Sequence, residues 1–207
     1  SEVRDSDHPN YARETFSYLA DHETGVVPTL HIMKVLGNLT EKDHSSDEYL
    51  NYIGEGIQRT YQGRIESAEQ RSDEATNIYK DLLENVKSMI VPMHDAGVTI
   101  YAGSDSGPFN SFVYPGVALH KELALLVEAG LTTAQALRSA TMHPASFFGM
   151  EDSSGQIKKG YEADIVLLEK NPLEDISNTQ TIHTIILDGK HIIDEEKRQS
   201  LLRIDGK

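Results

Sequence analysis

Apolar side chains recur every three or four positions along much of this chain, a spacing typical of amphipathic helices. The clearest stripe lies between Arg71 and Ala96 and consists of Tyr79, Leu82, Leu83, Val86, Met89, Ile90 and Met93. The same spacing predicts helices over residues 10–20, 49–62, 116–129 and 132–141, and a short one from 144 to 149. Thr132 and Gln135 have the spacing of a capping box, and Gly97 suits the left-handed position after a helix.

Runs rich in Val, Ile and Leu predict strands over residues 26–30, 98–102, 163–169 and 181–187. The first two runs alternate with helices, which favours a parallel pair and an α/β fold. Pro28 cannot donate a hydrogen bond to a neighbouring strand, so we expect an irregularity there. Asp188-Gly189 predicts a two-residue hairpin turn after the last run.

This set of strands is too small to shield itself from water. Two parallel strands cannot cover both of their faces, and parallel sheets are normally buried on both sides. Either other copies of the chain complete the sheets, as in a homo-oligomer, or further strands lie upstream. We favour the second alternative, since the chain opens with Ser1 and not Met. We therefore expect a carboxy-terminal part of a larger enzyme.

Composition removes several classes of function. The chain has 207 residues, 38% of them hydrophobic, which is enough for a core. Lys and Arg number 19 against 33 Asp and Glu, a formal charge of −14, so we expect no nucleic-acid partner. No apolar run approaches the roughly 20 residues of a membrane-spanning helix, so no membrane association is expected. The absence of cysteine excludes disulfides, thiolate zinc sites and cysteine nucleophiles, and leaves the compartment open.

The stretch VTIYAGSDSG, from Val98 to Gly107, carries the strongest candidate for chemistry. A solid apolar run ends there in small residues around one carboxylate, Asp105. An aspartate in such a turn can cap the next segment, which is a common structural role. It can also present its carboxylate to a metal ion or to a reacting proton. The residues alone leave both readings open.

Several blocks in order resemble the carboxy-terminal half of the metal-dependent amidohydrolases, in their imidazolonepropionase-like and Xaa-Pro dipeptidase-like branch. The blocks are AGVTIYAGSDSG, LHKELALLVEAGLTTAQALRSATMHPASFFGM, GQIKKGYEADIVLLEKNPLEDI and TIILDGK. VPTL, near the front, is similar to the strand-seven segment of that branch. The resemblance implies the last two strands and helices of a (β/α)8 TIM-type barrel over residues 1–150. Residues 151–207 would then add strands of a small β-sandwich.

The resemblance also implies site residues. Asp105 falls on the family's aspartate, which ligates the more buried metal and takes the proton of the attacking water. Substrate contacts are expected from Ser106, Gly107, His31 and His120. The cofactor would be a divalent metal, foremost zinc, with one or two ions in the full-length parent.

The family's other metal ligands are missing from this chain. They are a His-x-His pair, a bridging lysine or its carboxylate substitute, and two further histidines. We therefore expect this chain alone to bind metal weakly or not at all and to be inactive, because catalytic sites generally need about three protein ligands. The parent would hydrolyse a C–N bond in a small amide, cyclic amide or X-Pro dipeptide. The alternatives are a non-catalytic amidohydrolase-like scaffold and a binding module.

Three further expectations concern the surroundings of this site. The segment 36–63 is aromatic and long, so we predict that it forms a lid over the substrate pocket. Glu122 and Glu128 are expected on a solvated helix face. His143, which precedes Pro144, is expected to be structural.

Overall fold

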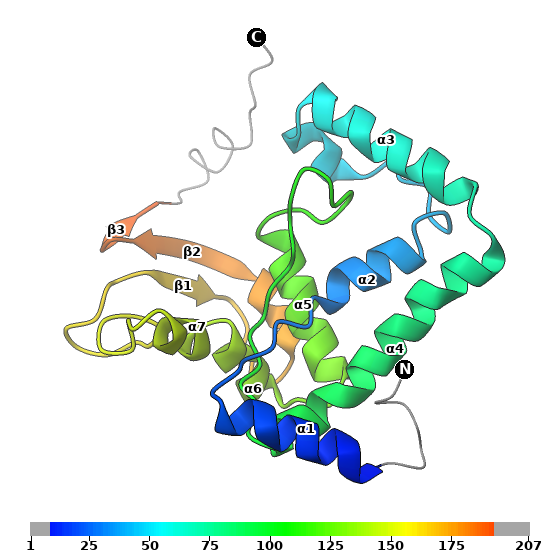
Figure 1. Cartoon of the computed structure of the whole chain (residues 1–207). Helices are drawn as coiled ribbons and strands as arrows, with labels where there is room; N and C mark the ends of the chain where they lie inside the picture. The colour runs from blue at the N-terminus through cyan, green and yellow to red at the C-terminus, as the bar shows by residue number, and fades with distance from the viewer. Residues whose placement is uncertain (1–8, 193–207) are drawn as a thin grey trace.

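The computed structural model describes residues 9–192, which form a mostly helical body with one small sheet (Figure 1). The helices are α1 (Pro9–Asp21), α2 (Leu30–Gly37), α3 (Glu55–Glu69), α4 (Asp73–Asp95), α5 (Val117–Glu128), α6 (Thr133–Ser139) and α7 (Met142–Phe147). Short 3-10 turns are η2 (Glu48–Tyr52) and η3 (Ile176–Gln180), and the strands are β1 (Ile165–Leu168), β2 (Ile182–Leu187) and β3 (Lys190–His191). Within this part of the chain, no helix is both long and apolar enough to cross a membrane.

The long helix α4 confirms the prediction for residues 71–96. It begins where the Ser72 side chain accepts a hydrogen bond from the Ala75 N–H, which satisfies a free donor of the first turn. It ends before Gly97, whose φ of 93° is favourable only for glycine. The apolar stripe of α4 packs against α1, α2 and α5 in one core that includes Leu30, Ile90 and Leu126.

The predicted capping box of α6 is also confirmed. The Thr132 side chain accepts a hydrogen bond from the Gln135 N–H, and the Gln135 side chain in turn accepts one from the Thr132 N–H. These reciprocal bonds fix the start of the helix.

The two expected barrel strands are much shorter than predicted. Residues 26–30 and 98–102 share one parallel bridge, between Val26 and Ile100. The orientation is as expected, but Leu30 already belongs to α2, and Thr29 before it has a φ of 47°. Pro28 has no N–H to extend the ladder, so pairing stops after Val26. The described residues therefore contain no parallel sheet.

A second correction concerns residues 49–62, which were expected to form one helix. Gly54 has an extended backbone at the start of α3, and it separates this helix from η2. Residues 38–47 form the loop before η2.

The antiparallel sheet has the order β1-β2-β3 and lies with α7 to one side of the helical body (Figure 1). Asp188 and Gly189 both have positive φ, 50° and 70°, which confirms the predicted tight turn. The described chain is thus mixed α/β. The complete barrel, the sandwich and a boundary near residue 150 remain predictions, and residues 193–207 of that last segment lie outside the described range.

Candidate functional site

Asp105 lies in the turn that follows residues 98–102, and its side chain is exposed. Its φ of 52° is in the left-handed region, which aspartate tolerates better than most residues. The Asn110 side-chain amide donates a hydrogen bond to the Asp105 backbone oxygen at 2.6 Å. The turn is thus held through the backbone, and the carboxylate is left open to solvent.

The residues around Asp105 have different roles in shaping this turn. The hydroxyls of Ser104 and Ser106 lie 2.8 Å apart and hydrogen-bond across it. At Gly103 a Cβ would lie only 2.4 Å from Val27 Cγ1, so glycine lets the two extended segments approach closely. At Gly107 a Cβ would meet nothing within 4 Å, so steric crowding gives no reason for glycine there.

The predicted contacts His31 and His120 point to different places. His120 Nδ1 lies 2.9 Å from the Thr179 hydroxyl, so this ring joins α5 to η3. Burial, and then the charge of Lys121, lower the pKa of His120. His31, by contrast, lines a pocket that none of Asp105, Ser106, Gly107 and His120 lines. The structure therefore does not gather the predicted residues into one described cavity. His143 is hydrogen-bonded to the Ile100 carbonyl at 2.9 Å, in agreement with its expected structural role.

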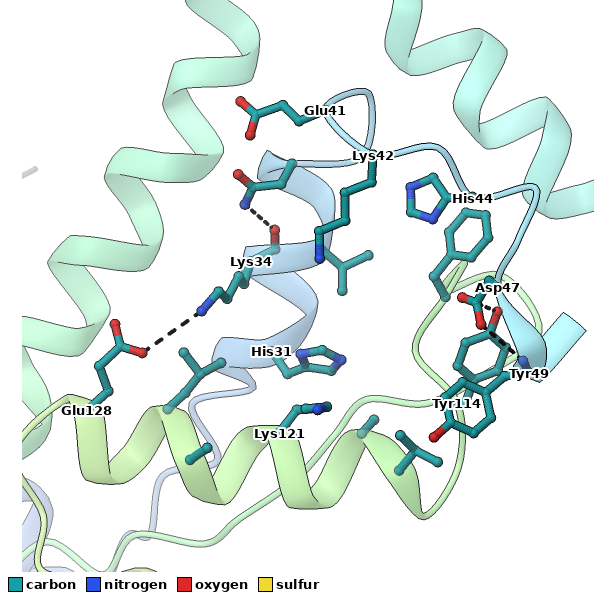
Figure 2. A pocket seen from close by; sticks show the side chains of 17 residues that line it. His31, Lys34, Glu41, Lys42, His44, Asp47, Tyr49, Tyr114, Lys121 and Glu128 are labelled. Carbon is teal, nitrogen blue, oxygen red and sulfur yellow. Dashed lines mark hydrogen bonds and ion pairs between the residues drawn. The ribbon is translucent and has the colours of Figure 1, made fainter. Parts of the chain in front are cut away.

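The pocket around His31 has a volume of about 690 Å³ and lies between α2, α5 and the loop that leads to η2. Figure 2 shows His31, Lys42 and Lys121 directed into it, with Tyr49 and Tyr114 at one end. Burial, followed by the positive charges of Lys121, Lys34 and Lys42, lowers the pKa of His31 to about 4. Its imidazole is therefore neutral near pH 7.

Glu122 is the residue that sequence reasoning placed wrongly, because it is fully buried and not solvated. Its two carboxylate oxygens accept hydrogen bonds from the N–H groups of Leu30 and His31, at 2.9 and 2.7 Å. Burial raises the pKa of Glu122 to about 7, although these two bonds act in the opposite direction. A sequence signal existed, since Glu122 shares a helix face with Ala118, Leu125 and Leu126, which are all buried. Glu128 is exposed, as expected, and pairs with Lys87.

The predicted lid segment packs on the loop that carries Asp105. Tyr61 lies with its ring centroid 4.9 Å from Phe112, and Tyr49 lies 5.1 Å from Tyr114. The Tyr114 hydroxyl donates a 2.9 Å hydrogen bond to Asp47. The segment is therefore fixed to the 103–116 loop, and its action as a lid stays a prediction.

Comparison with known proteins now decides the family. The amidohydrolase family model matches residues 46–192, which is more than half of the chain. The chain belongs to the amidohydrolase family. This match confirms the resemblance found in the sequence and includes both the Asp105 turn and the antiparallel sheet.

Among curated relatives, the amidohydrolase chain is similar to ochratoxinase of Aspergillus niger, with 42% identity over 83 residues. Those residues are 39% of this chain and 16% of the relative. Imidazolonepropionase of Vibrio vulnificus is 34% identical over 88 residues, which are 39% of this chain and 22% of the relative. The chain thus spans less than a quarter of either relative.

Solved structures show the same fold relationship. A Xaa-Pro dipeptidase with methionine bound in its active site matches with a TM-score of 0.61 at 22% identity, covering 86% of this chain and 36% of that one. The Aspergillus niger ochratoxinase structure matches with a TM-score of 0.60 at 23% identity. The match covers 86% of this chain and 34% of the ochratoxinase chain. This amidohydrolase chain therefore corresponds to about a third of each complete protein.

Members of the amidohydrolase family typically depend on metal, but the described residues of this chain do not fit a complete metal site. No group of three or more His, Cys, Asp or Glu between residues 9 and 192 is placed to hold an ion. Asp105 stands as a single exposed carboxylate. A catalytic metal generally requires about three protein ligands, so these residues alone cannot hold one firmly.

Proposed function

We propose that this chain is the carboxy-terminal part of a metal-dependent enzyme that hydrolyses a C–N bond in an amide, a cyclic amide or an X-Pro dipeptide. The observation that carries the proposal is the exposed Asp105 carboxylate at the end of an extended segment, in a chain of the amidohydrolase family. The remaining metal ligands, with zinc as the first candidate ion, would come from polypeptide outside the described residues.

The arrangement of the two extended segments supports this role for Asp105. Their parallel bridge at Val26 and Ile100 directs both carboxyl ends toward the same edge. In barrel enzymes the active site lies at the carboxyl ends of the strands. A carboxylate there can accept a proton from attacking water and later give it to the departing nitrogen. We assign this proton transfer to Asp105, and assign Ser106 and Gly107 to the adjoining substrate surface.

The substrate class rests on the relatives. Imidazolonepropionase and the Xaa-Pro dipeptidase support a small-molecule substrate with a C–N bond. His31 remains a candidate contact only if substrate reaches its pocket, and His120 is the weakest candidate because its ring is bonded to Thr179.

The decisive experiment compares this chain with a longer polypeptide that supplies the missing ligands. Release of free amine from X-Pro dipeptides and N-acyl amino acids would be measured with added zinc. We expect turnover by the longer protein, none by this chain, and loss of at least a thousandfold in kcat for Asp105→Asn. Asp152→Asn, an exposed surface change, is the matched control.

The second candidate function is a non-catalytic amidohydrolase-like scaffold or binding module. The observation that favours it is the lack of a metal-binding group among residues 9–192. A longer polypeptide that binds no zinc and hydrolyses none of the substrates would support this alternative. Turnover by the 207-residue chain alone would contradict the proposal that its site is partial.

A further inference from the structure

Three lysines line the pocket around His31: Lys34, which pairs with Glu128, and two that come from other elements. Lys42 belongs to the loop after α2, and Lys121 belongs to α5. Figure 2 shows both side chains directed into the same space, beside the neutral His31 ring. The lining also contains three carboxylates, those of Glu41, Asp47 and Glu128.

The carboxylates that line this pocket already have partners. Glu128 pairs with Lys87 at 2.6 Å and with Lys34 at 3.9 Å. Glu41 pairs with Lys80, and Asp47 accepts the Tyr114 hydroxyl. Lys42 and Lys121, by contrast, form no ion pair with any carboxylate in the described part of the chain. Their ammonium groups are therefore available to an anion from outside.

The wall beside these two cations is apolar and partly aromatic. Phe112, Val117 and Ala118 line it, and Tyr49 and Tyr114 continue it. The Phe112 ring stacks on His44, with the ring centroids 3.9 Å apart. Ala118, Phe112 and Tyr114 are buried, so Val117 and Tyr49 supply most of the exposed apolar surface that a flat hydrocarbon group can contact.

We propose that this pocket binds a small organic acid whose carboxylate lies between Lys42 and Lys121 and whose flat apolar body rests on the aromatic wall. Each ammonium group can donate to a carboxylate oxygen, and the volume of about 690 Å³ is within the range of small-molecule sites. Asp105 does not line the pocket, so this proposal goes beyond the proton transfer assigned to Asp105.

An anion at this position has a consequence for His31. The positive charges of Lys121, Lys34 and Lys42 help to lower the pKa of this histidine. A bound carboxylate offsets those charges and so acts to raise the pKa of His31, whereas the added burial acts to lower it. A change in the His31 titration measured by NMR, in either direction, therefore reports occupancy without any assay of activity.

The test uses the 207-residue chain and three probes of similar size: benzoate, benzamide and benzylammonium. We expect benzoate to bind with a Kd on the order of 1 mM, as measured by chemical-shift titration. Benzamide and benzylammonium should bind at least tenfold more weakly. Lys42→Gln and Lys121→Gln should each weaken benzoate about tenfold, because each loses a charge-assisted hydrogen bond. Lys159→Gln, at an exposed site outside the pocket, should leave the Kd unchanged.

Acetate separates the two halves of the site, because it has the carboxylate without the ring. Binding of acetate as tight as that of benzoate would overturn the role of the aromatic wall. Equal binding of benzoate and benzamide, or unchanged benzoate binding by the Lys42→Gln, Lys121→Gln double variant, would overturn the proposal.

Discussion

The carboxylate of Glu122 in α5 accepts a hydrogen bond from the backbone N–H of His31 at 2.7 Å, which joins residues 91 positions apart. The second oxygen binds the Leu30 N–H, so Glu122 caps the first turn of α2 from another helix. This fixes the point at which the extended segment after Val26 becomes helical.

Glu122 and His31 are expected to give opposite pH dependences to the free energy of unfolding. Between about 4.5 and about 7, native Glu122 keeps a proton that the unfolded chain releases, so stability falls as pH rises. Between about 4 and about 6.5, unfolded His31 binds a proton that the native ring does not, so stability rises with pH. Each effect changes the free energy of unfolding by about 3 kcal/mol over its pH range. In the unmodified chain the two effects largely cancel where these ranges overlap.

Single variants should separate these effects in denaturant unfolding measured from pH 4 to pH 7.5. Glu122→Gln should make stability rise with pH, and His31→Asn should make it fall. Glu122→Gln should also lower stability above about pH 7, where the ionised carboxylate accepts from both backbone donors and the amide can accept from only one. If both variants keep the pH profile of the unmodified chain, the assigned pKa shifts of Glu122 and His31 are wrong.

Tyr114→Phe should loosen the segment over residues 38–52. The change removes the hydrogen bond to Asp47, which carries a charge and is therefore worth about 1.5–3 kcal/mol. Burial, and then this hydrogen bond, raise the pKa of Tyr114, so its hydroxyl remains a donor. Hydrogen exchange should become faster in residues 38–52 and stay unchanged in α6. Tyr52→Phe, at a more exposed ring, is the control and should change neither region.

Gly103→Ala should destabilise the chain by about 1–3 kcal/mol, because the new Cβ meets Val27 Cγ1 at 2.4 Å. Gly107→Ala, four residues on, meets no neighbouring atom and should change stability by less than about 0.5 kcal/mol. Thermal and denaturant unfolding would measure both. Val27→Ala should restore much of the loss when combined with Gly103→Ala, and failure of this rescue would locate the strain elsewhere.

Thr132→Ala should lower stability by about 1 kcal/mol through loss of the capping box at α6. Thr132→Ser keeps the hydroxyl, so its free energy of unfolding should remain within a few tenths of a kcal/mol of that of the unmodified chain. Equal losses in both variants, measured by denaturant unfolding, would assign the effect to the Thr132 methyl group and not to the cap.

The sequence by itself determined the local elements. The stripe from Tyr79 to Met93, the Thr132 cap and the Asp188-Gly189 turn depend on residues close together in the chain, so their pattern specified them. The ordered blocks around Asp105 also indicated the family. The extended segments at Val26 and Ile100 were overestimated, because strand length depends on neighbouring strands that a local pattern does not contain.

Only the tertiary structure decided the buried and charged relationships. Glu122 reads as an ordinary acidic helix residue until α2 supplies its two N–H donors from 91 and 92 positions away. Lys42 and Lys121 likewise become one binding surface only when a loop and α5 meet beside His31. Hydrogen bonds and charges act through space, whereas periodicity describes order along the chain. This part of the site could therefore be recognised only from the tertiary structure.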